Sequence, residues 1–227
     1  MKKDSLKDPS LFERVLRLVY PMKCMFCDSL LPDTDNLRVC DACYKLLPRM
    51  GRPFYAVPHM PYINGLFAAY HYEDEIEKAI HAMKFQGRPQ FSRDLAFLLS
   101  EEMQKQPVYD FDLIVPVPMH RKKQRQRGYN QSQLLARELS GHLGVPVGEI
   151  LIKTRHTKAQ SSLGREERLT NLEGAFKLSE GVNPEGMNIL LLDDVTTTGS
   201  TLNACARVLY EAGTSWIFAS VIAIAGN

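Results

Sequence analysis

Residues 189–201 read I-L-L-L-D-D-V-T-T-T-G-S-T, and this stretch decides the fold. Its aliphatic start predicts a short strand that is buried on both faces, as in a parallel sheet. Beyond the polar residues, apolar side chains return at helical spacing at Leu202, Cys205, Val208 and Leu209. We therefore expect a strand, a tight loop and a helix, with Ser200 or a preceding threonine as the helix cap.

The loop of this unit has the composition of an anion site. Hydroxyls and backbone amides at a helix N-terminus attract a phosphate, and Gly199 would let the backbone approach it closely. The adjacent carboxylates of Asp193 and Asp194 would repel a phosphate, so they need another partner. Such acids accept hydrogen bonds from the vicinal hydroxyls of a ribose, or hold Mg²⁺ through water. A sugar diol, a 5′-phosphate and a metal together describe 5-phosphoribosyl-1-pyrophosphate (PRPP). A polar turn after a buried strand is the plainer alternative.

Length and composition are those of an ordinary soluble globular protein. The chain has 227 residues, of which 44% are hydrophobic and 24% charged, and its net charge is +2. This length suits one α/β domain with a small appendage. The sequence has neither an apolar run of about 18 residues nor an apolar signal region, so we expect no membrane-spanning helix and a cytoplasmic location.

Four of the five cysteines form the pattern C-x2-C-x12-C-x2-C at Cys24, Cys27, Cys40 and Cys43. Each C-x2-C pair bends the chain into a knuckle, and two knuckles supply the four soft ligands of a closed Zn²⁺ site. We expect a small structural zinc ribbon, with an amphipathic helix before it at residues 9–20. An iron–sulfur centre and a redox dithiol are the alternatives. Cys205 is expected to be a small core residue.

A second polar edge follows the apolar stretch at residues 112–118, which ends in Pro116 and Pro118. Five cations come next, at Arg121, Lys122, Lys123, Arg125 and Arg127. They lead into a helix that Gly144 closes, and we expect them to attract an anion. A pyrophosphate and a nucleic-acid backbone are both candidates, and a solvated loop is the alternative. The polar residues 156–171 are expected to form either a mobile lid or a loop with a short helical turn at 165–170.

Strand and helix patterns alternate along residues 51–227, with strands near 65–72, 149–155 and 216–225 besides the two above. This order predicts an α/β fold with an open parallel sheet and helices on both faces. Ligands bind at the carboxyl ends of such strands, where residues 116–118 and 193–201 both lie. We expect two domains: residues 1–50 with the cysteines, and residues 51–227 with the sheet.

The motifs in their order resemble the ComF family, also called the ComFC/GntX group. They are the four-cysteine module, P-V-P, R-Q-R-G-Y-N-Q, R-x-x-N-x-x-G-A-F and L-L-L-D-D-V-T-T-T-G-S-T. The last of these resembles the PRPP signature of type I phosphoribosyltransferases. The resemblance implies the type I phosphoribosyltransferase fold, a structural zinc, PRPP with Mg²⁺, and a role in the uptake of transforming DNA.

By the same resemblance, Asp193 and Asp194 hold the ribose of PRPP and are the catalytic acids. The resemblance further implies that the PRPP loop consists of Val195, Thr196, Thr197, Thr198, Gly199, Ser200 and Thr201. Val117 and Pro118 would form the pyrophosphate loop. The cations implied for pyrophosphate are Arg125, Arg127, Arg155, Arg165 and Arg168.

Two hypotheses of function follow. In the first, the chain is an enzyme, a Mg²⁺-dependent phosphoribosyltransferase whose acceptor the sequence does not reveal. In the second, it is a non-catalytic module that senses PRPP and binds single-stranded DNA or competence proteins, with Arg121, Lys122 and Lys123 at the DNA. The sequence leaves the oligomeric state open.

Overall fold

The computed structural model describes residues 21–32, 36–51, 54–55, 59–106, 110–155, 172 and 174–226. Its strands are β1 (Phe54–Tyr55), β2 (Gly65–His71), β3 (Leu113–Pro116), β4 (Leu151–Lys153), β5 (Phe176–Leu178), β6 (Asn188–Thr196) and β7 (Trp216–Ile224). Its helices are α2 (Asp41–Leu46), α3 (Asp74–Phe85), α4 (Phe91–Gln104), α5 (Arg121–Arg127), α6 (Gln131–Leu143) and α8 (Ser200–Glu211). Among these helices, none combines the length and the apolar character needed to cross a membrane. The helix predicted at residues 9–20 and the lid predicted at 156–171 lie outside the described residues.

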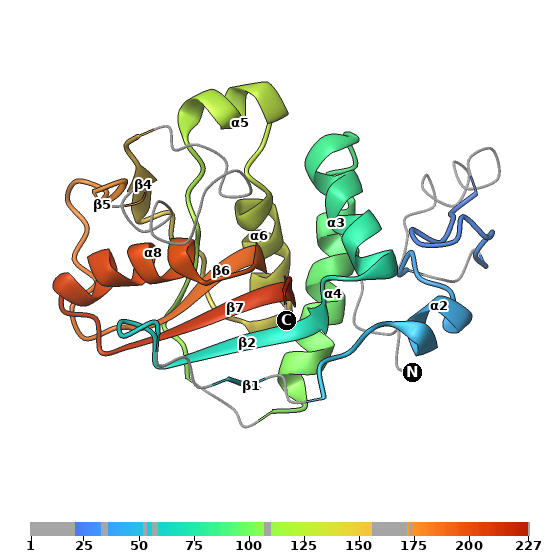
Figure 1. Ribbon diagram of the computed structural model, residues 1–227, viewed down its shortest axis with the longest axis horizontal. Coiled ribbons are helices and arrows are strands. Elements are labelled where there is room, and N and C mark those ends of the chain that lie inside the picture. Colours follow the sequence, from blue (N-terminus) through green and yellow to red (C-terminus); the bar gives the residue numbers. More distant parts are fainter. Residues whose placement is uncertain are drawn as a thin grey trace.

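The main sheet has the strand order β1-β2-β7-β6-β3 (Figure 1). The strands β2, β7, β6 and β3 are parallel, and the short β1 is antiparallel to β2 at one edge. The predicted parallel sheet is therefore confirmed. The strand expected near residues 149–155 forms as β4, but it pairs antiparallel with β5 outside this sheet. Only Leu151 of β4 is buried, so the strand lacks the two apolar faces that an inner parallel strand needs.

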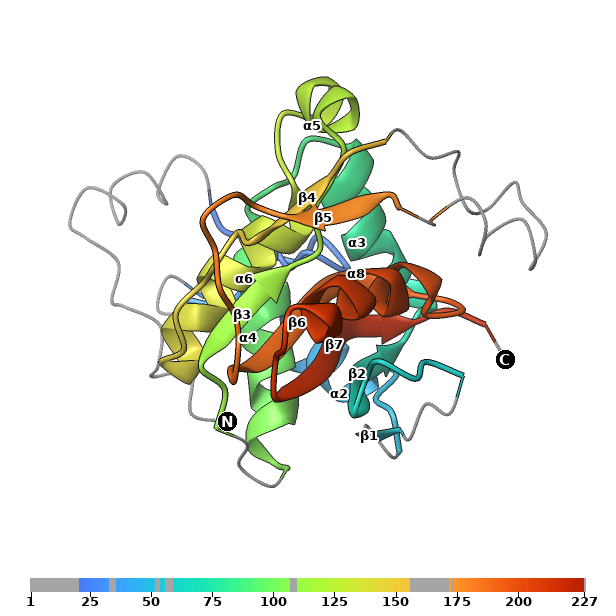
Figure 2. The same cartoon turned by 90° about the vertical axis from the view of Figure 1, so that its left-hand side faces the viewer.

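Helices cover both faces of the sheet, as predicted. On one face Phe67, Leu190 and Ile222 pack in a common core with α3, α4 and α6. On the other face Leu66 and Leu191 pack with α8 and the β4–β5 pair. Figure 2 shows this pair between α5 and the main sheet. Successive side chains of a strand point to opposite faces, so the unbroken aliphatic run of β6 fills both cores.

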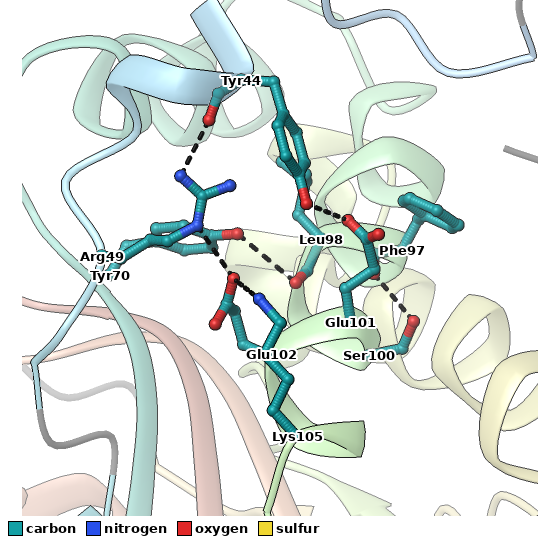
Figure 3. Close-up of polar contacts among 9 residues, drawn as sticks. All are labelled: Tyr44, Arg49, Tyr70, Phe97, Leu98, Ser100, Glu101, Glu102 and Lys105. Carbon is teal, nitrogen blue, oxygen red and sulfur yellow. Dashed lines mark hydrogen bonds and ion pairs between the residues drawn. The ribbon is translucent and has the colours of Figure 1, made fainter. Parts of the chain in front are cut away.

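The cysteine module, which comprises the described residues between 21 and 50, docks on α4 through polar contacts. Asp94 of α4 is fully buried; it accepts a hydrogen bond from the Arg38 amide at 3.0 Å and pairs with the Arg38 guanidinium at 3.3 Å. A second contact joins Tyr44 Oη to Glu101 Oε2 at 3.0 Å (Figure 3). These contacts fix the module to the same helix that packs on the sheet.

Arg49 is the centre of the network in Figure 3. Its Nε donates to Glu102 Oε1 at 3.0 Å, and another guanidinium nitrogen donates to the Tyr44 carbonyl at 2.8 Å. The guanidinium also stacks over the Tyr44 ring, 4.5 Å from its centroid. Glu102 accepts a further bond from Lys105 at 2.7 Å, but the Lys105 side chain is 54% exposed. The Arg49 pair is the more shielded of the two, with side-chain exposures of 27% and 12%.

We predict that Arg49→Met lowers the free energy of unfolding by about 2 kcal/mol, because it leaves the largely buried Glu102 with only its solvent-exposed partner. Urea denaturation followed by circular dichroism measures this change. Lys105→Met is the matched control and should change stability by less than about 0.5 kcal/mol, as expected for an exposed pair. Equal effects of the two substitutions would contradict the assigned role of Arg49.

Candidate functional site

The acidic pair lies at the carboxyl end of β6, and its two members have different partners. Asp193 Oδ1 accepts hydrogen bonds from Ser132 Oγ at 2.7 Å and from the Asp194 amide at 2.9 Å. Asp194 is 2% exposed, and its Oδ1 accepts from the Val195 amide at 2.8 Å. Its Oδ2 forms an ion pair with Lys84 Nζ of α3 at 2.7 Å. The sequence suggested equivalent acids. In the structure Asp194 forms an ion pair with Lys84, whereas Asp193 forms no ion pair with any of the described residues.

Electrostatics separate the two acids further. Burial and the neighbouring charge of Asp194 raise the pKa of Asp193 to about 7, although Ser132 opposes the change. For Lys84, burial acts to lower the pKa, but the charge of Asp194 outweighs it and the pKa is raised. Lys84 therefore stays charged at neutral pH. A cation or a hydrogen-bond donor brought by a ligand would stabilise the ionised carboxylate of Asp193.

Three further cations lie close enough to this pair for their charges to interact with it. They are Lys123 and Arg127 of α5 and Lys153 of β4. Burial and the charges of Arg127 and Lys84 lower the pKa of Lys123, and burial followed by the charge of Lys123 lowers that of Lys153. Positive charges that depress one another's pKa form a site that an anion would stabilise. Sequence analysis missed Lys84 and Lys153, because neither belongs to a motif.

The predicted anion-binding arginines are not all at this place. Residues 121–127 form the helix α5, which the sequence analysis did not predict, and one face of this helix carries Lys123 and Arg127, four residues apart. Arg127 is half-buried and donates to Gln131 Oε1 at 2.5 Å. Arg125 and Arg155 are exposed. Arg165 and Arg168 lie outside the described residues.

The segment 128–132 connects three parts of the site. The Asn130 side chain is buried; its Nδ2 donates to the Val117 carbonyl at 3.0 Å, and its Oδ1 caps α6 by accepting from the Ser132 amide at 3.2 Å. Tyr129 Oη donates to the Met83 carbonyl, one residue before Lys84. The segment thus holds the turn after β3, which includes Val117 and Pro118, near the acids. An asparagine directly before a helical pattern was the available signal for this cap.

The hydroxyl loop after β6 differs from its prediction in one respect. Gly199 is the N-cap of α8, with φ of 72°, and makes no side-chain cap hydrogen bond. The predicted cap by Ser200 or a threonine is therefore wrong: Ser200 begins the helix, and its Oγ lies 2.7 Å from Thr198 Oγ1. A Cβ at position 199 would also displace the Met60 side chain, but it is the left-handed backbone that requires glycine. A helix start without a side-chain cap leaves backbone amides for a ligand.

The four predicted cysteines converge, with their Sγ atoms all within 4.8 Å of one another. The Cys27 and Cys40 sulfurs are 3.7 Å apart, close to the edge of about 3.8 Å that a tetrahedron with Zn–S bonds of about 2.3 Å requires. Hydrogen bonds from Ser29 lower the pKa of Cys27 to about 6, which favours a thiolate. The first pair lies in a knuckle closed by a Lys23–Leu30 bridge. The second pair is at the start of α2, with Cys40 as its N-cap, and from this helix start both of its sulfurs reach the same cluster.

We predict that Asp193→Asn stabilises the ligand-free protein at pH 8 by about 1–2 kcal/mol, and that this gain becomes smaller toward pH 5 as the native carboxyl is protonated. Between the ordinary pKa of an aspartate and the native pKa of about 7, the native protein binds more protons at Asp193 than the unfolded chain does. The stability of the wild type therefore falls as the pH rises through this range. Asparagine removes the charge and keeps an acceptor for Ser132. Thermal melts at the two pH values measure the effect. Asp110→Asn, at an exposed acid, is the control; a gain at pH 5 as large as that at pH 8 would refute the assignment.

Comparisons with known proteins agree with this architecture. A model of the phosphoribosyl transferase domain matches residues 129–227. Competence protein F of Haemophilus influenzae is 35% identical over 149 residues, 63% of this chain and 65% of that protein, so the chain spans just under two thirds of this relative. DNA utilization protein YhgH of Escherichia coli K12 is 31% identical over 188 residues, 81% of this chain and 76% of that protein.

Among solved structures, the glutamine PRPP amidotransferase of B. subtilis, complexed with ADP and GMP, is similar with a TM-score of 0.39 and 20% identity. The similarity covers 57% of this chain and 25% of that one. The identity of 31% to YhgH of Escherichia coli K12, over 81% of this chain and 76% of that protein, shows that the chain belongs to the ComF/ComFC/YhgH family of proteins with a phosphoribosyltransferase domain.

Proposed function

We propose that this protein binds PRPP with Mg²⁺ at the carboxyl edge of the sheet and transfers the phosphoribosyl group to an acceptor. One observation carries the proposal: Asp193, which forms no ion pair among the described residues, ends the strand that leads to an α8 N-terminus without a side-chain cap, and the charges of nearby lysines act on it. A phosphorylated sugar with a diol and a pyrophosphate complements each of these features. The family resemblance supports the same ligand.

Each segment of the site has a role in this proposal. Residues 195–201 surround the 5′-phosphate, with the amides at the start of α8 as donors. Asp193 accepts from the ribose hydroxyls, and Asp194 is positioned beside it by Lys84. The turn at Val117 and Pro118 takes the pyrophosphate, helped by Arg127 and by other cations near the pair.

The chemistry is the departure of pyrophosphate from the ribose, which develops negative charge on the leaving group and positive charge on the sugar. Lys84, Lys123 and Lys153 are in place to stabilise the leaving group electrostatically, and the acids are in place to stabilise the sugar. The carboxylate oxygens of Asp193 suit Mg²⁺, which when bound would add charge for the pyrophosphate. No side chain of the described site stands in the position of a general base, so the acceptor must supply an adequate nucleophile.

The module at the N-terminal end is proposed to hold a structural zinc ion. The four sulfurs form a closed set, and the amides of Cys40 and Cys43 donate to the sulfurs of Cys24 and Cys40, both at 3.4 Å. Cysteines used as metal ligands suit a reducing compartment, which supports a cytoplasmic location. The names of the relatives, competence protein and DNA utilization protein, support a role in the handling of incoming DNA.

The rival function is a PRPP sensor that does not turn over. Both functions need the same binding site, so binding alone does not separate them. A screen of acceptors for pyrophosphate release separates the two functions. Release with any acceptor supports the enzyme, whereas PRPP binding without pyrophosphate release supports the sensor.

We predict that PRPP binds in the presence of Mg²⁺ and that Asp193→Asn weakens binding at least tenfold, because it removes the charge that faces the ribose and the metal. A tenfold loss corresponds to about 1.4 kcal/mol. Titration calorimetry at pH 8 measures it, with Asp110→Asn as the control. Equal affinity of the Asp193 variant and the parent would reject this site.

We also predict one zinc ion per chain, and a loss of stability when it is removed. Elemental analysis of the purified protein gives the stoichiometry, and thermal melts with and without a strong chelator give the effect. Cys27→Ser should lower both zinc content and melting temperature, whereas Cys205→Ala, in the sheet core, should lower only the latter. Full zinc occupancy in the Cys27 variant, or the presence of iron instead, would contradict this prediction.

A further inference from the structure

A pocket of about 550 Å³ lies along α8, beside the β4–β5 pair. The strand β5 lies above α8 in both Figure 1 and Figure 2, and Gly174 and Phe176, around its start, line one side of the pocket. These two residues belong to the G-A-F motif, which the proposed PRPP site does not use. The other side is one face of the helix, with residues three or four apart: Ser200, Asn203, Ala204, Arg207, Val208 and Glu211. The volume suits a small molecule.

Apolar side chains supply much of the wall of this pocket. Leu172 and Phe176 line it and are both buried. The Phe176 ring is held from another direction by Lys153, whose Nζ lies 5.1 Å from the ring centroid. Tyr62 also lines the pocket, and its ring lies 5.5 Å from that of Tyr210. Aromatic rings that are fixed by their neighbours offer flat surfaces on which a planar ligand can stack.

Asn203 brings an unsatisfied polar group to the same pocket. Its Oδ1 is buried and accepts no hydrogen bond from any residue that the structure describes. Its backbone amide, in contrast, donates to the Gly199 carbonyl at 2.8 Å as part of the helix. A buried carbonyl oxygen without a donor is destabilising, and such groups are uncommon in folded proteins. A ligand that presents an N–H group to Asn203 would remove this unfavourable feature.

The charges in the lining restrict the ligand further. Among the described residues of the lining, Arg207 and Glu211 are the charged side chains, and they pair with each other at 2.7 Å. The lining that they belong to has no net charge, so it favours an uncharged ligand over one that carries a phosphate. A planar, uncharged molecule with an N–H group at its edge has the chemistry of a nucleobase, either free or within a nucleoside.

We propose that this pocket binds an uncharged nucleobase, which stacks on the aromatic wall and donates from an N–H group to Asn203 Oδ1. Asparagine side chains recognise the edges of bases by hydrogen bonds of this kind. The pocket is separate from the proposed PRPP site, because its described lining contains neither Asp193 nor Asp194 and shares only Ser200 with the PRPP loop. The base is therefore a second ligand and not the acceptor of the phosphoribosyl group.

The test uses ¹H–¹⁵N NMR spectra of the whole protein, titrated with adenine and with uracil. At least one of these bases should shift the side-chain amide signal of Asn203, which is identified by its absence from the spectrum of Asn203→Leu. The methylated forms without an N–H group, N6,N6,9-trimethyladenine and 1,3-dimethyluracil, should bind about fivefold more weakly. Adenosine and uridine show whether the preferred ligand carries a sugar, and AMP and UMP should bind more weakly than these nucleosides.

Two substitutions test the pocket itself. Asn203→Leu should weaken binding of the base about fivefold and yet melt at no lower temperature than the parent, because it removes the unsatisfied oxygen and keeps a similar shape. Ala204→Phe fills the pocket from the helix and should weaken binding more than about tenfold. Gln104→Leu, at an exposed amide near the end of α4, is the matched control and should bind as the parent does.

Four results would overturn this site: no response to either base, equal binding by the methylated forms, a nucleotide that binds more tightly than its nucleoside, or Asn203→Leu that binds like the parent or melts at a lower temperature. Displacement of the base by PRPP with Mg²⁺ would also place it in the other site. Asp193→Asn should bind the base with the parent's affinity, and Asn203→Leu should bind PRPP with the parent's affinity. A failure of this pocket is thereby distinguished from a failure of the PRPP site.

Discussion

Asp194 is almost completely buried at the end of β6, and Lys84 of α3 makes this possible by placing an ammonium 2.7 Å from its Oδ2. A buried carboxylate without such a partner would be strongly destabilising. The pair therefore ties α3 to the central strand at the point where the chain must also hold a ligand. Because Lys84 is committed to Asp194, the neighbouring Asp193 bears the unfavourable environment, which its raised pKa reports. Asp194 thus has a structural partner in Lys84, whereas Asp193 accepts hydrogen bonds only from Ser132 and the Asp194 amide among the described residues.

The remainder of the site depends on the edge where the parallel strands end. There the turn after β3, the start of α6 and the loop before α8 meet, and Asn130 and Ser132 connect them by side-chain hydrogen bonds to Val117 and Asp193. Repulsion between like charges is tolerated here because the sheet below is packed on both faces. The destabilising features, a raised acid pKa and cations that depress one another's pKa, are those that an anionic sugar ligand would relieve.

The cysteine module is attached to the same framework from the other side. Its contacts with α4 include a fully buried carboxylate and the stacked Arg49, so it is fixed to the helix layer that also packs against α6 and the sheet. A groove beside the module is lined by residues of the module, of α3 and of α4.

The sequence alone determined the parallel α/β fold, the cysteine cluster and the place of the acidic pair, because each has a local signature: aliphatic runs, a fixed cysteine spacing, and adjacent acids after a strand. Tertiary structure decided the rest. Lys84 and Lys153 come from segments far along the chain and have no motif, so only folding shows that they approach Asp193 and Asp194. The same holds for β4, which lies outside the main sheet and buries only Leu151, and for Gly199, whose φ of 72° and approach to Met60 the composition of the loop did not show. Spacing along a chain specifies local geometry, whereas long-range electrostatic partners depend on packing that no local pattern encodes.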